Sequence, residues 1–392
     1  MDTETFDAIV IGAGMAGATA AAHLAADHRV VMLEAEEAAG YHSTGRSAAM
    51  YIVTYGPPDA RALTRLSRDF FVSPPPGFCD HPLLSRRAAV FLARPGETAE
   101  IDRLVAEVPG VRAIAISELK VMVPALKPDY AAAAALEEDD FDIDVAALHQ
   151  GFLRRFAASG GVLLLRSRAQ RIERRGGAWE VGMASGTAVR ASVLVNAAGA
   201  WGDEVAKIAS VRPLGLSPCR RTGVIIDPAP FAPEHWPLIH DVGSTWYVRP
   251  EARTRLMVSP ADETPVPPQD VQPEELDIAI AIERMQEALE IPVRRVERSW
   301  AGLRTFTPDH NLAFGWDGEA PGFFWCVGQG GWGIQTAPAA GRLVADVIAG
   351  RDPGPAGRIL ATIDPRRFTK ANTGGVVAGS GGAAHNLTET TN

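Results

Sequence analysis

The sequence predicts an α/β protein with a Rossmann-like nucleotide-binding domain and a second domain built on a mostly antiparallel sheet. Three observations predict this fold. A glycine-rich loop joins an apolar strand to an alanine-rich helix near the start of the chain. A second glycine-rich run, GQGGWGIQTA, occupies residues 328–337. Between them, residues 213–268 carry many prolines and alternating segments such as TGVIID and TWYVRP, which are typical of antiparallel strands.

The start of the chain has the pattern of a βαβ unit. Residues 6–11, FDAIVI, form a nearly continuous apolar run, as expected of a parallel strand buried on both faces. The alanine-rich segment MAGATAAAHLAAD predicts the helix, and RVVML predicts a second buried strand that ends before Glu34. A crossover of this kind places the loop after the first strand at the edge where ligands bind.

That loop carries the spacing G-x-G-x-x-G, with Gly12, Gly14 and Gly17 flanking Ala16. The glycines allow a tight turn, a close backbone approach to a pyrophosphate and close helix packing. Glu34, followed by Ala35, ends the next strand, where a carboxylate can hold a ribose hydroxyl pair. Together these features predict dinucleotide binding, whereas a glycine turn with only a structural role would not require the carboxylate.

The second glycine run indicates which dinucleotide binds. An NAD enzyme needs one such fingerprint, whereas a flavin ring lies far from its adenosine and requires a late segment to return to it. Residues 328–337 follow the strand GFFWCV and enter a helix, so their N–H groups can face the ring. The sequence therefore predicts FAD as the cofactor.

Changes of pattern predict the domain boundaries. Residues 89–135 introduce a strand, a turn and an amphipathic helix of a different domain, and a helix from Asp144 to Gly160 and Gly161 returns to the first. The sequence composition after about residue 370 has little to bury. We expect a discontinuous FAD-binding domain of residues 1–88, 142–212 and 299–365, a substrate domain of residues 89–141 and 213–298, and a flexible tail of residues 366–392.

Composition excludes several classes of function. The formal net charge of −9 argues against nucleic acid as a partner. The chain has no secretory signal and no long apolar run that would predict a membrane span, so we expect a cytoplasmic protein. Cys79, Cys219 and Cys326 are too widely separated to predict a disulfide or a metal site, and small buried side chains are the expected role.

Five segments carry a resemblance to a known family: GYHSTGRSAA at 40–49, VLVNAAGAW at 193–201, RPLGLSPCRR at 212–221, WAGLR at 300–304 and GQGGWGIQ at 328–335. The chain resembles the FAD-dependent D-amino-acid oxidase and glycine/sarcosine oxidase superfamily, and within it the D-arginine dehydrogenase type. The resemblance extends to about residue 365. It implies a FAD-binding domain of the glutathione-reductase-like kind.

The resemblance also implies which residues contact the flavin and its phosphates. Arg46 is one of them, with a surface role as the alternative. No cysteine lies in the return segment WAGLRTFTPDHNLAFG, so FAD is expected to bind without a covalent bond. The implied residues beyond the first loop and Glu34 are Ser43, Thr44, Gly45, Arg46, Ser47, Ala48, Ala49, Met50, Ala169, Gly330, Gly331, Trp332, Gly333, Ile334 and Gln335.

For the substrate, the resemblance implies a carboxylate held by Arg221 and Arg304, with Tyr55 and Tyr247 closing over it. The backbone carbonyl of Gly331 would receive the amine, and Gln335 completes the implied catalytic set. A guanidinium can hold a carboxylate through two parallel hydrogen bonds, which suits this role. Tyr51, in the same segment as Tyr55, has either a site role or a core role.

The expected reaction is oxidative deamination of a D-amino acid, with formal hydride transfer from the α-carbon to flavin N5 and hydrolysis of the imino acid to a 2-oxo acid and ammonia. Three alternatives remain: oxidation of a secondary amine such as sarcosine, oxidation of a 2-hydroxy acid, and a flavin-binding protein without turnover. Oxygen and a quinone or other carrier both remain open as the electron acceptor. No catalytic histidine is expected; His23, His149 and His310 are interpreted as capping or surface residues.

The sequence departs from the D-arginine dehydrogenase type at the substrate side chain. In that type a glutamate grips the distal guanidinium, and here Ala88 stands at the matching position. Met50 and Ile52 replace a histidine and a threonine, so we expect an apolar or neutral substrate side chain rather than D-arginine. His240 replaces an apolar residue and would favour a polar side chain instead.

Overall fold

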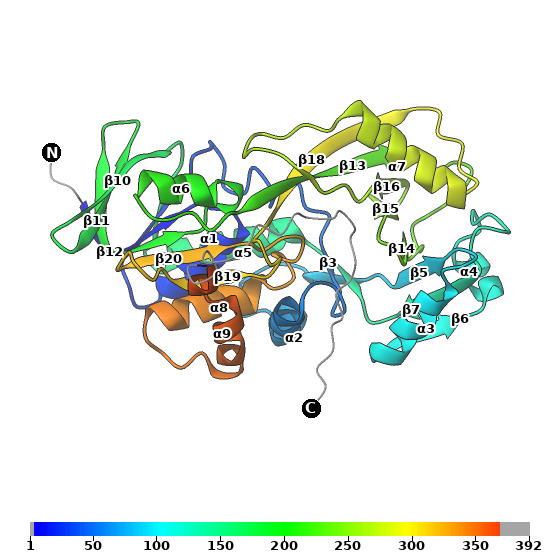
Figure 1. The fold of residues 1–392 in the computed structure, drawn as a ribbon, viewed down its shortest axis with the longest axis horizontal. Coiled ribbons are helices and arrows are strands. Elements are labelled where there is room, and N and C mark those ends of the chain that lie inside the picture. Colours follow the sequence, from blue (N-terminus) through cyan, green and yellow to red (C-terminus); the bar gives the residue numbers. More distant parts are fainter. Residues whose placement is uncertain (1–3, 369–392) are drawn as a thin grey trace.

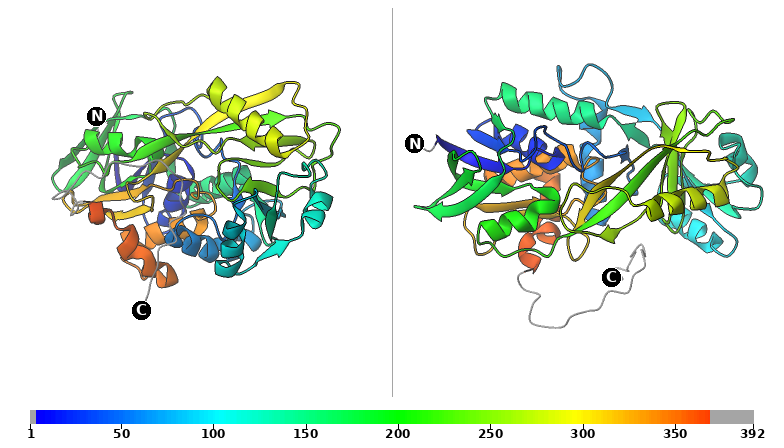
Figure 2. Two further views of the ribbon diagram at one scale, coloured as in Figure 1. Left: turned by 45° about the vertical axis from the view of Figure 1, so that its right-hand side comes forward. Right: turned by 90° about the horizontal axis from the view of Figure 1, so that it is seen from above.

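A computed structural model of the chain describes residues 4–368. Two large sheets lie at opposite ends of the elongated molecule, with a small sheet between them (Figures 1 and 2). Most of the predicted tail, residues 369–392, lies outside the described residues. Residues 366–368, also assigned to that tail, instead belong to the 3₁₀ helix Pro365–Phe368, because Arg367 pairs with Asp309 at 2.7 Å and donates to the Leu312 carbonyl at 2.8 Å.

The first sheet contains the predicted βαβ unit. Its main path runs β10-β11-β12-β1-β2-β9, and β20 extends it from β12 and pairs with β19. β1 pairs in parallel with both β2 and β12. The strands are β1 Glu4–Ile11, β2 Val30–Leu33, β9 Val162–Leu164, β10 Ala169–Arg175, β11 Ala178–Met183, β12 Ala188–Asn196, β19 Ala313–Trp316 and β20 Phe323–Val327.

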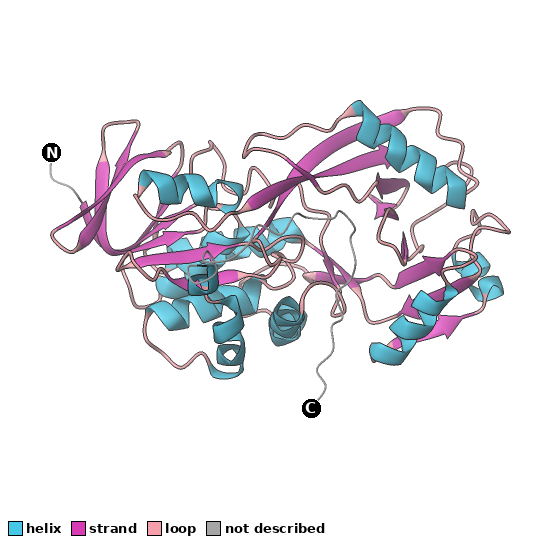
Figure 3. Cartoon of the chain, viewed as in Figure 1, coloured by secondary structure: helices cyan, strands magenta, loops and turns pink. Residues whose placement is uncertain are grey.

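Helices lie on both sides of the first sheet, with α6 (Gly202–Ile208) above it and α8 (Ala337–Ile348) below it in the view of Figures 1 and 3. α1 (Met15–Leu24) packs between α5 (Val145–Ala158) and α8, and its alanines allow the close approach. Asp144 caps α5 by accepting from the Ala147 N–H at 2.8 Å, as predicted. The other helices of this half are α2 Pro58–Val72 and α9 Leu360–Ile363.

The second sheet is mostly antiparallel, as predicted, and only β14 and β5 pair in parallel along it. α7 (Glu275–Ala288) covers one face and α3 (Thr98–Glu107) covers part of the other. Its order is β17-β13-β16-β15-β14-β5-β7-β6, with β18 on β13. The strands are β5 Ala89–Ala93, β6 Val111–Ile114, β7 Ala133–Glu137, β13 Ser217–Ile226, β14 Leu238–Asp241, β15 Tyr247–Glu251, β16 Arg255–Ser259, β17 Thr264–Pro265 and β18 Val296–Phe306; α4 (Ile116–Met122) completes this half.

β13 and β18 form the long ribbon that joins the two halves (Figure 1). The sequence assigned residues from 299 onward to the cofactor domain, yet β18 pairs with β13 from Val296 to Phe306, so it belongs to the second sheet. The small middle sheet, order β3-β8-β4, consists of Met50–Tyr51, Phe141–Ile143 and Leu84–Arg86. Among the described residues, none of the helices combines the length and apolar character that crossing a membrane requires.

Candidate cofactor and substrate site

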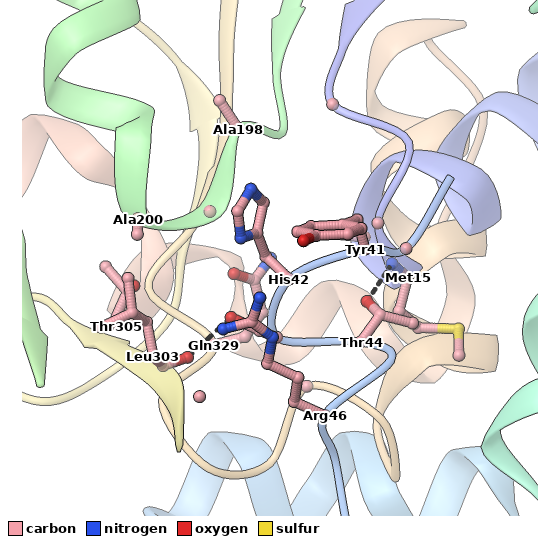
Figure 4. Close-up of a pocket in the computed structure, with 18 of the residues that line it drawn as sticks. Met15, Tyr41, His42, Thr44, Arg46, Ala198, Ala200, Leu303, Thr305 and Gln329 are labelled. Carbon is pink, nitrogen blue, oxygen red and sulfur yellow. Dashed lines mark hydrogen bonds between the residues drawn. The ribbon is translucent and has the colours of Figure 1, made fainter. Parts of the chain in front are cut away.

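A long cleft opens where the first sheet meets the β13–β18 ribbon (Figure 4). Its empty space, counted together with the open mouth, is about 1890 Å³, and its lining runs from the end of β1 to the residues before α8. One end is lined by the glycine loop after β1, and the other by the second glycine run and the predicted arginines. The cleft therefore suits an extended ligand with two chemically different ends.

The first glycine loop is packed too tightly for side chains. A Cβ on Gly12 would lie 2.5 Å from the Ala197 carbonyl oxygen, and one on Gly17 only 1.8 Å from the Gly12 carbonyl oxygen. Gly14 faces the cleft, where a Cβ would meet only the Thr44 hydroxyl at 3.3 Å. The N–H of Met15, at the start of α1, donates to that hydroxyl at 2.9 Å (dashed in Figure 4). The loop thus presents the N-terminus of α1 to the cleft.

Two side chains hold this loop in place. Glu34 accepts from the Ala13 N–H at 2.9 Å and from the Glu36 N–H at 3.0 Å, and it lines the cleft. His149 on α5 contacts the Ala13 carbonyl through Nε2 at 2.9 Å. The interpretation of His149 as a capping or surface residue is wrong, because its side chain is buried at this loop. Burial lowers its pKa, against the opposing effects of the Ala13 carbonyl and Glu34.

Residues 40–49 form one long wall of the cleft and are tied to the ribbon. Ser43 donates to the Leu303 carbonyl at 2.7 Å. Arg46 donates to the carbonyls of Val271 (3.0 Å) and Ala301 (3.1 Å) and pairs with Asp270. Its guanidinium therefore already joins the two halves of the molecule, which limits what it can offer to a phosphate.

The second glycine run lines the opposite end of the cleft. Gly330 has φ +50°, a conformation that favours glycine, and its neighbours to Ile334 precede α8. Trp332 does not line the cleft but packs edge-on against Tyr55 at 5.9 Å between ring centroids. Gln335 is likewise behind the wall, where it accepts from the Ile52 N–H at 3.0 Å and donates to the Tyr55 carbonyl at 3.2 Å.

Arg221 and Arg304 project from the same face of the ribbon. Arg221 lies opposite Gly302, two residues from Arg304, so the two arginines are diagonal neighbours. Tyr247 lies beside both: burial acts to raise its pKa, but the two guanidinium groups outweigh burial and lower it. Arg304 donates to the Tyr55 hydroxyl at 2.8 Å. A Cβ on Gly331 would lie 2.5 Å from that hydroxyl and 2.9 Å from Arg304, so these groups converge.

The two arginines differ in their partners. Arg221 donates to the Asp262 carbonyl at 2.8 Å and pairs with the Glu263 carboxylate at 2.7 Å. The side chain of Glu263 is 40% exposed, so water can replace it. Glu263 is not predicted from the sequence, because it lies 42 residues from Arg221 along the chain and no motif contains it.

Most predicted site residues line this cleft, and six are not among its lining residues. The six are Gly17, Gly45, Met50, Tyr55, Trp332 and Gln335. Predicted residues that line it are Gly12, Gly14, Ala16, Glu34, Ala35, Ser43, Thr44, Arg46, Ser47, Ala48, Ala49, Ala169, Arg221, Tyr247, Arg304, Gly330, Gly331, Gly333 and Ile334. The lining also includes Met257, which lies in none of the five motifs, and Tyr41, His42 and Trp201, which lie in the motifs but are not among the predicted contacts; of these, only His42 stands out in the sequence as a histidine within the flavin motif.

The donor set fits FAD. Glycine-loop N–H groups and the start of α1 suit a pyrophosphate, and Glu34 at the end of β2 suits a ribose. Ser167, whose N–H donates to the Glu34 carbonyl at 2.7 Å, and Ala169 also line the cleft and suit an adenine, while the second glycine run lines another part of it. Among all lining side chains, the only paired cations that converge on one point are Arg221 and Arg304, beside that second run.

Comparisons with known proteins agree with this geometry. A family model described as DAO, FAD dependent oxidoreductase, matches residues 7–347. FAD-dependent oxidoreductase domain-containing protein 1 of Xenopus laevis is 29% identical over 199 residues, or 46% of this chain and 39% of that protein. The chain therefore matches about two fifths of that relative's length.

Solved structures share the fold over nearly the whole chain. Glycine oxidase from Geobacillus kaustophilus has a TM-score of 0.80 at 20% identity, covering 93% of this chain and 99% of that one. L-proline dehydrogenase from P. horikoshii has a TM-score of 0.74 at 22% identity, covering 94% and 99%. The predicted α/β fold, a Rossmann-like domain joined to a mostly antiparallel sheet, is confirmed. With its family model spanning residues 7–347, the chain belongs to the DAO family of FAD-dependent oxidoreductases.

Proposed function

We propose that the protein oxidises a D-amino acid with an apolar or neutral side chain to the 2-oxo acid and ammonia. The observation that carries the proposal is the convergence of Arg221, Arg304 and Tyr247 beside Gly331. Two guanidinium groups in a partly desolvated cleft attract a carboxylate strongly, and their fork geometry fixes its orientation. A protein that only carries a flavin has no use for such a pair.

The residues divide the work of this reaction. Bound FAD would supply the electron acceptor for the α-hydrogen. Arg221 and Arg304 hold the carboxylate, and the Gly331 carbonyl accepts from the amine. This arrangement brings the α-carbon near the second glycine run and retains the substrate in one orientation. Tyr55 covers the clamp through its hydrogen bond to Arg304 and excludes water from it.

An apolar cluster next to Tyr247 supports an apolar side chain. Met50, Ala89 and Leu238 are buried together, with Ile52 packed against them. The expectation for Ala88 is wrong: strand pleating directs it to the opposite face of the second sheet, where it packs against the core beneath α7. The expected preference for an apolar side chain therefore depends on Met50 and Ile52 rather than on Ala88.

The test is an anaerobic screen in which substrates bleach the flavin of the purified protein. Apolar D-amino acids are expected to bleach it fastest, whereas L-amino acids, sarcosine, glycine and 2-hydroxy acids are expected to react slowly. Best turnover of D-arginine or D-lysine would overturn the substrate assignment. A preference for glycine, sarcosine or L-proline would replace D-amino acids by those amines, and admitting air afterwards reports whether oxygen accepts the electrons.

We further propose that FAD is bound without a covalent link. None of the three cysteines, all of which are described, lines the cleft. Burial raises the pKa of Cys326 to about 12, so its thiolate is scarce at neutral pH. Flavin should therefore stay in the supernatant when acid precipitates the protein, and a yellow pellet would contradict this. The cytoplasmic location and the D-arginine dehydrogenase subtype remain predictions.

A further inference from the structure

The segment of residues 52–56, between β3 and α2, carries Tyr55 to the clamp. Gln335 fixes this segment at two backbone points, the Ile52 N–H and the Tyr55 carbonyl. The Tyr55 hydroxyl accepts from Arg304. Between these attachments, the Thr54 hydroxyl donates to the Glu137 carboxylate at 2.7 Å. The segment is thus attached to the first half of the molecule by Gln335 and to the second sheet by Glu137.

Glu137 lies on the face of the second sheet that bears the clamp. It is opposite Ala89, which packs with Met50 in the apolar cluster described above. The side chains of two residues that pair across neighbouring strands point to the same face of the sheet, and so do those of residues two apart along one strand. Phe91, His240 and Tyr247 form the adjacent cross-strand row on this face. Glu137 therefore lies on the same face of the second sheet as Tyr247, and from there it contacts Thr54 in the segment of residues 52–56.

Nothing about the fold requires a carboxylate at this point. Glu137 is 6% exposed, and its strand neighbours Ala89 and Val111 are apolar. Burial raises its pKa, Thr54 opposes the rise and Asp139 adds to it. Asp140, in the β7–β8 loop, is fully buried with both carboxylate oxygens unpartnered, and burial followed by repulsion from Glu137 raises its pKa. Burying a carboxylic acid without a counter-ion costs folding free energy. The presence of Glu137 at this buried point therefore indicates a role other than packing.

We propose that Glu137 is a positioning residue that acts through Thr54 to hold residues 52–56 in the conformation that sets the Tyr55 hydroxyl against Arg304. This inference rests on the proposed function, since it assigns a support to the same clamp. Loss of the Thr54 bond frees the middle of the segment while Gln335 still holds its ends. Tyr55 then covers the carboxylate for a smaller fraction of the time, which weakens substrate binding more than it slows the chemical step.

Thr54→Val tests the bond with almost no change in volume, and Thr54→Ser is the matched control because it keeps the hydroxyl. In the flavin-loaded protein without substrate, Thr54→Val should speed amide hydrogen exchange in the peptide spanning residues 50–58 about tenfold, the effect of losing a hydrogen bond to a charged group. Exchange elsewhere should not change. With the best substrate of the screen, the KM of Thr54→Val should be about tenfold higher than that of the parent. Its kcat should differ from the parent value by less than about twofold. Thr54→Ser should match the parent.

Glu137→Gln separates the bond from the charge. It keeps an acceptor for Thr54 but cannot ionise, and the ionisable groups that act on Glu137 are Asp139 and Asp140. As the pH rises from about 6 to about 9, only the parent acceptor becomes charged, which strengthens its hydrogen bond. The ratio of variant to parent KM, and of their exchange rates in residues 50–58, should therefore grow with pH.

The proposal is overturned if Thr54→Val leaves exchange in residues 50–58 at the parent rate, or if Thr54→Ser fails to restore it. It is also overturned if Glu137→Gln shows the same ratio to the parent at every pH. Hydrogen exchange requires no turnover, so these outcomes stand even if no amine bleaches the parent flavin. That result would remove the proposed function alone.

Discussion

The two ends of the cleft are built in different ways. At the end near β1, backbone N–H groups, Gly12, Gly14 and the Glu34 carboxylate face the cleft, and all of them come from the first 34 residues. At the other end, side chains from β13, β15, β18 and the second glycine run converge, with Glu263 and Glu137 behind them. The first end depends on close backbone packing, and the second depends on the balance of charges in a desolvated space.

The substitution with the largest expected effect should disrupt only the end of the cleft near β1. Gly17→Ala places a Cβ 1.8 Å from the Gly12 carbonyl, so the loop must shift away from its position at α1. We expect loss of nearly all bound FAD, measured as flavin absorbance per protein after desalting. Gly182→Ala is the control, because its Cβ would lie 3.5 Å from its nearest neighbour. Full flavin content in Gly17→Ala would mean that the packing of this loop does not decide cofactor binding.

Arg304→Lys should break the second end and leave the first intact. Lysine keeps the positive charge but loses the fork that binds a carboxylate through two hydrogen bonds and the bond to Tyr55. We expect kcat/KM for the best substrate to fall on the order of 100-fold, as when two charge-assisted hydrogen bonds are lost. Flavin content should stay at the parent level. Unchanged kinetics would remove Arg304 from the clamp.

Asp140→Asn should change how the Tm of the protein depends on pH, because Asp140 is buried near Glu137 in the second half of the molecule. The folded-state pKa of Asp140 is raised by burial and by Glu137, so its contribution to stability is present at low pH and is lost as the pH rises through that value. The variant cannot ionise. Its Tm relative to the parent should therefore increase between about pH 5 and about pH 9, by a few degrees if about 1 kcal/mol is involved. A constant Tm difference would show that Asp140 does not titrate in this range.

The smallest expected effect concerns the unequal arginines. Glu263 pairs with Arg221, so under the proposed function it must release Arg221 before that arginine can hold a substrate carboxylate. Because the pair is partly exposed, its strength is modest, about 0.2–1 kcal/mol. Glu263→Gln should therefore lower KM by at most about fivefold without raising kcat. The effect should shrink at high salt, which screens the pair in the parent. A higher KM would mean that Glu263 assists substrate binding.

The same contrast explains how much of the molecule the sequence predicts. The βαβ unit, its glycine loop and the capped helix α5 depend on neighbours within a few residues, and these predictions are confirmed. The Thr54–Glu137 and Arg221–Glu263 contacts span 83 and 42 residues, and no local pattern marks them. His149 and Ala88 were misjudged for a related reason. Which way a side chain faces depends on strand pleating and helix packing that only the assembled sheets define.

Because the two clamp arginines stand on one hydrogen-bonded ribbon, the spacing between their attachment points is a fixed length of the scaffold rather than a property of loops. If the two arginines hold the substrate carboxylate as proposed, the walls of the cleft can change to suit a new side chain while the spacing of the two arginines stays the same. Variants of this protein that accept bulkier substrates are therefore expected to carry their changes around Met50, Ile52 and His240.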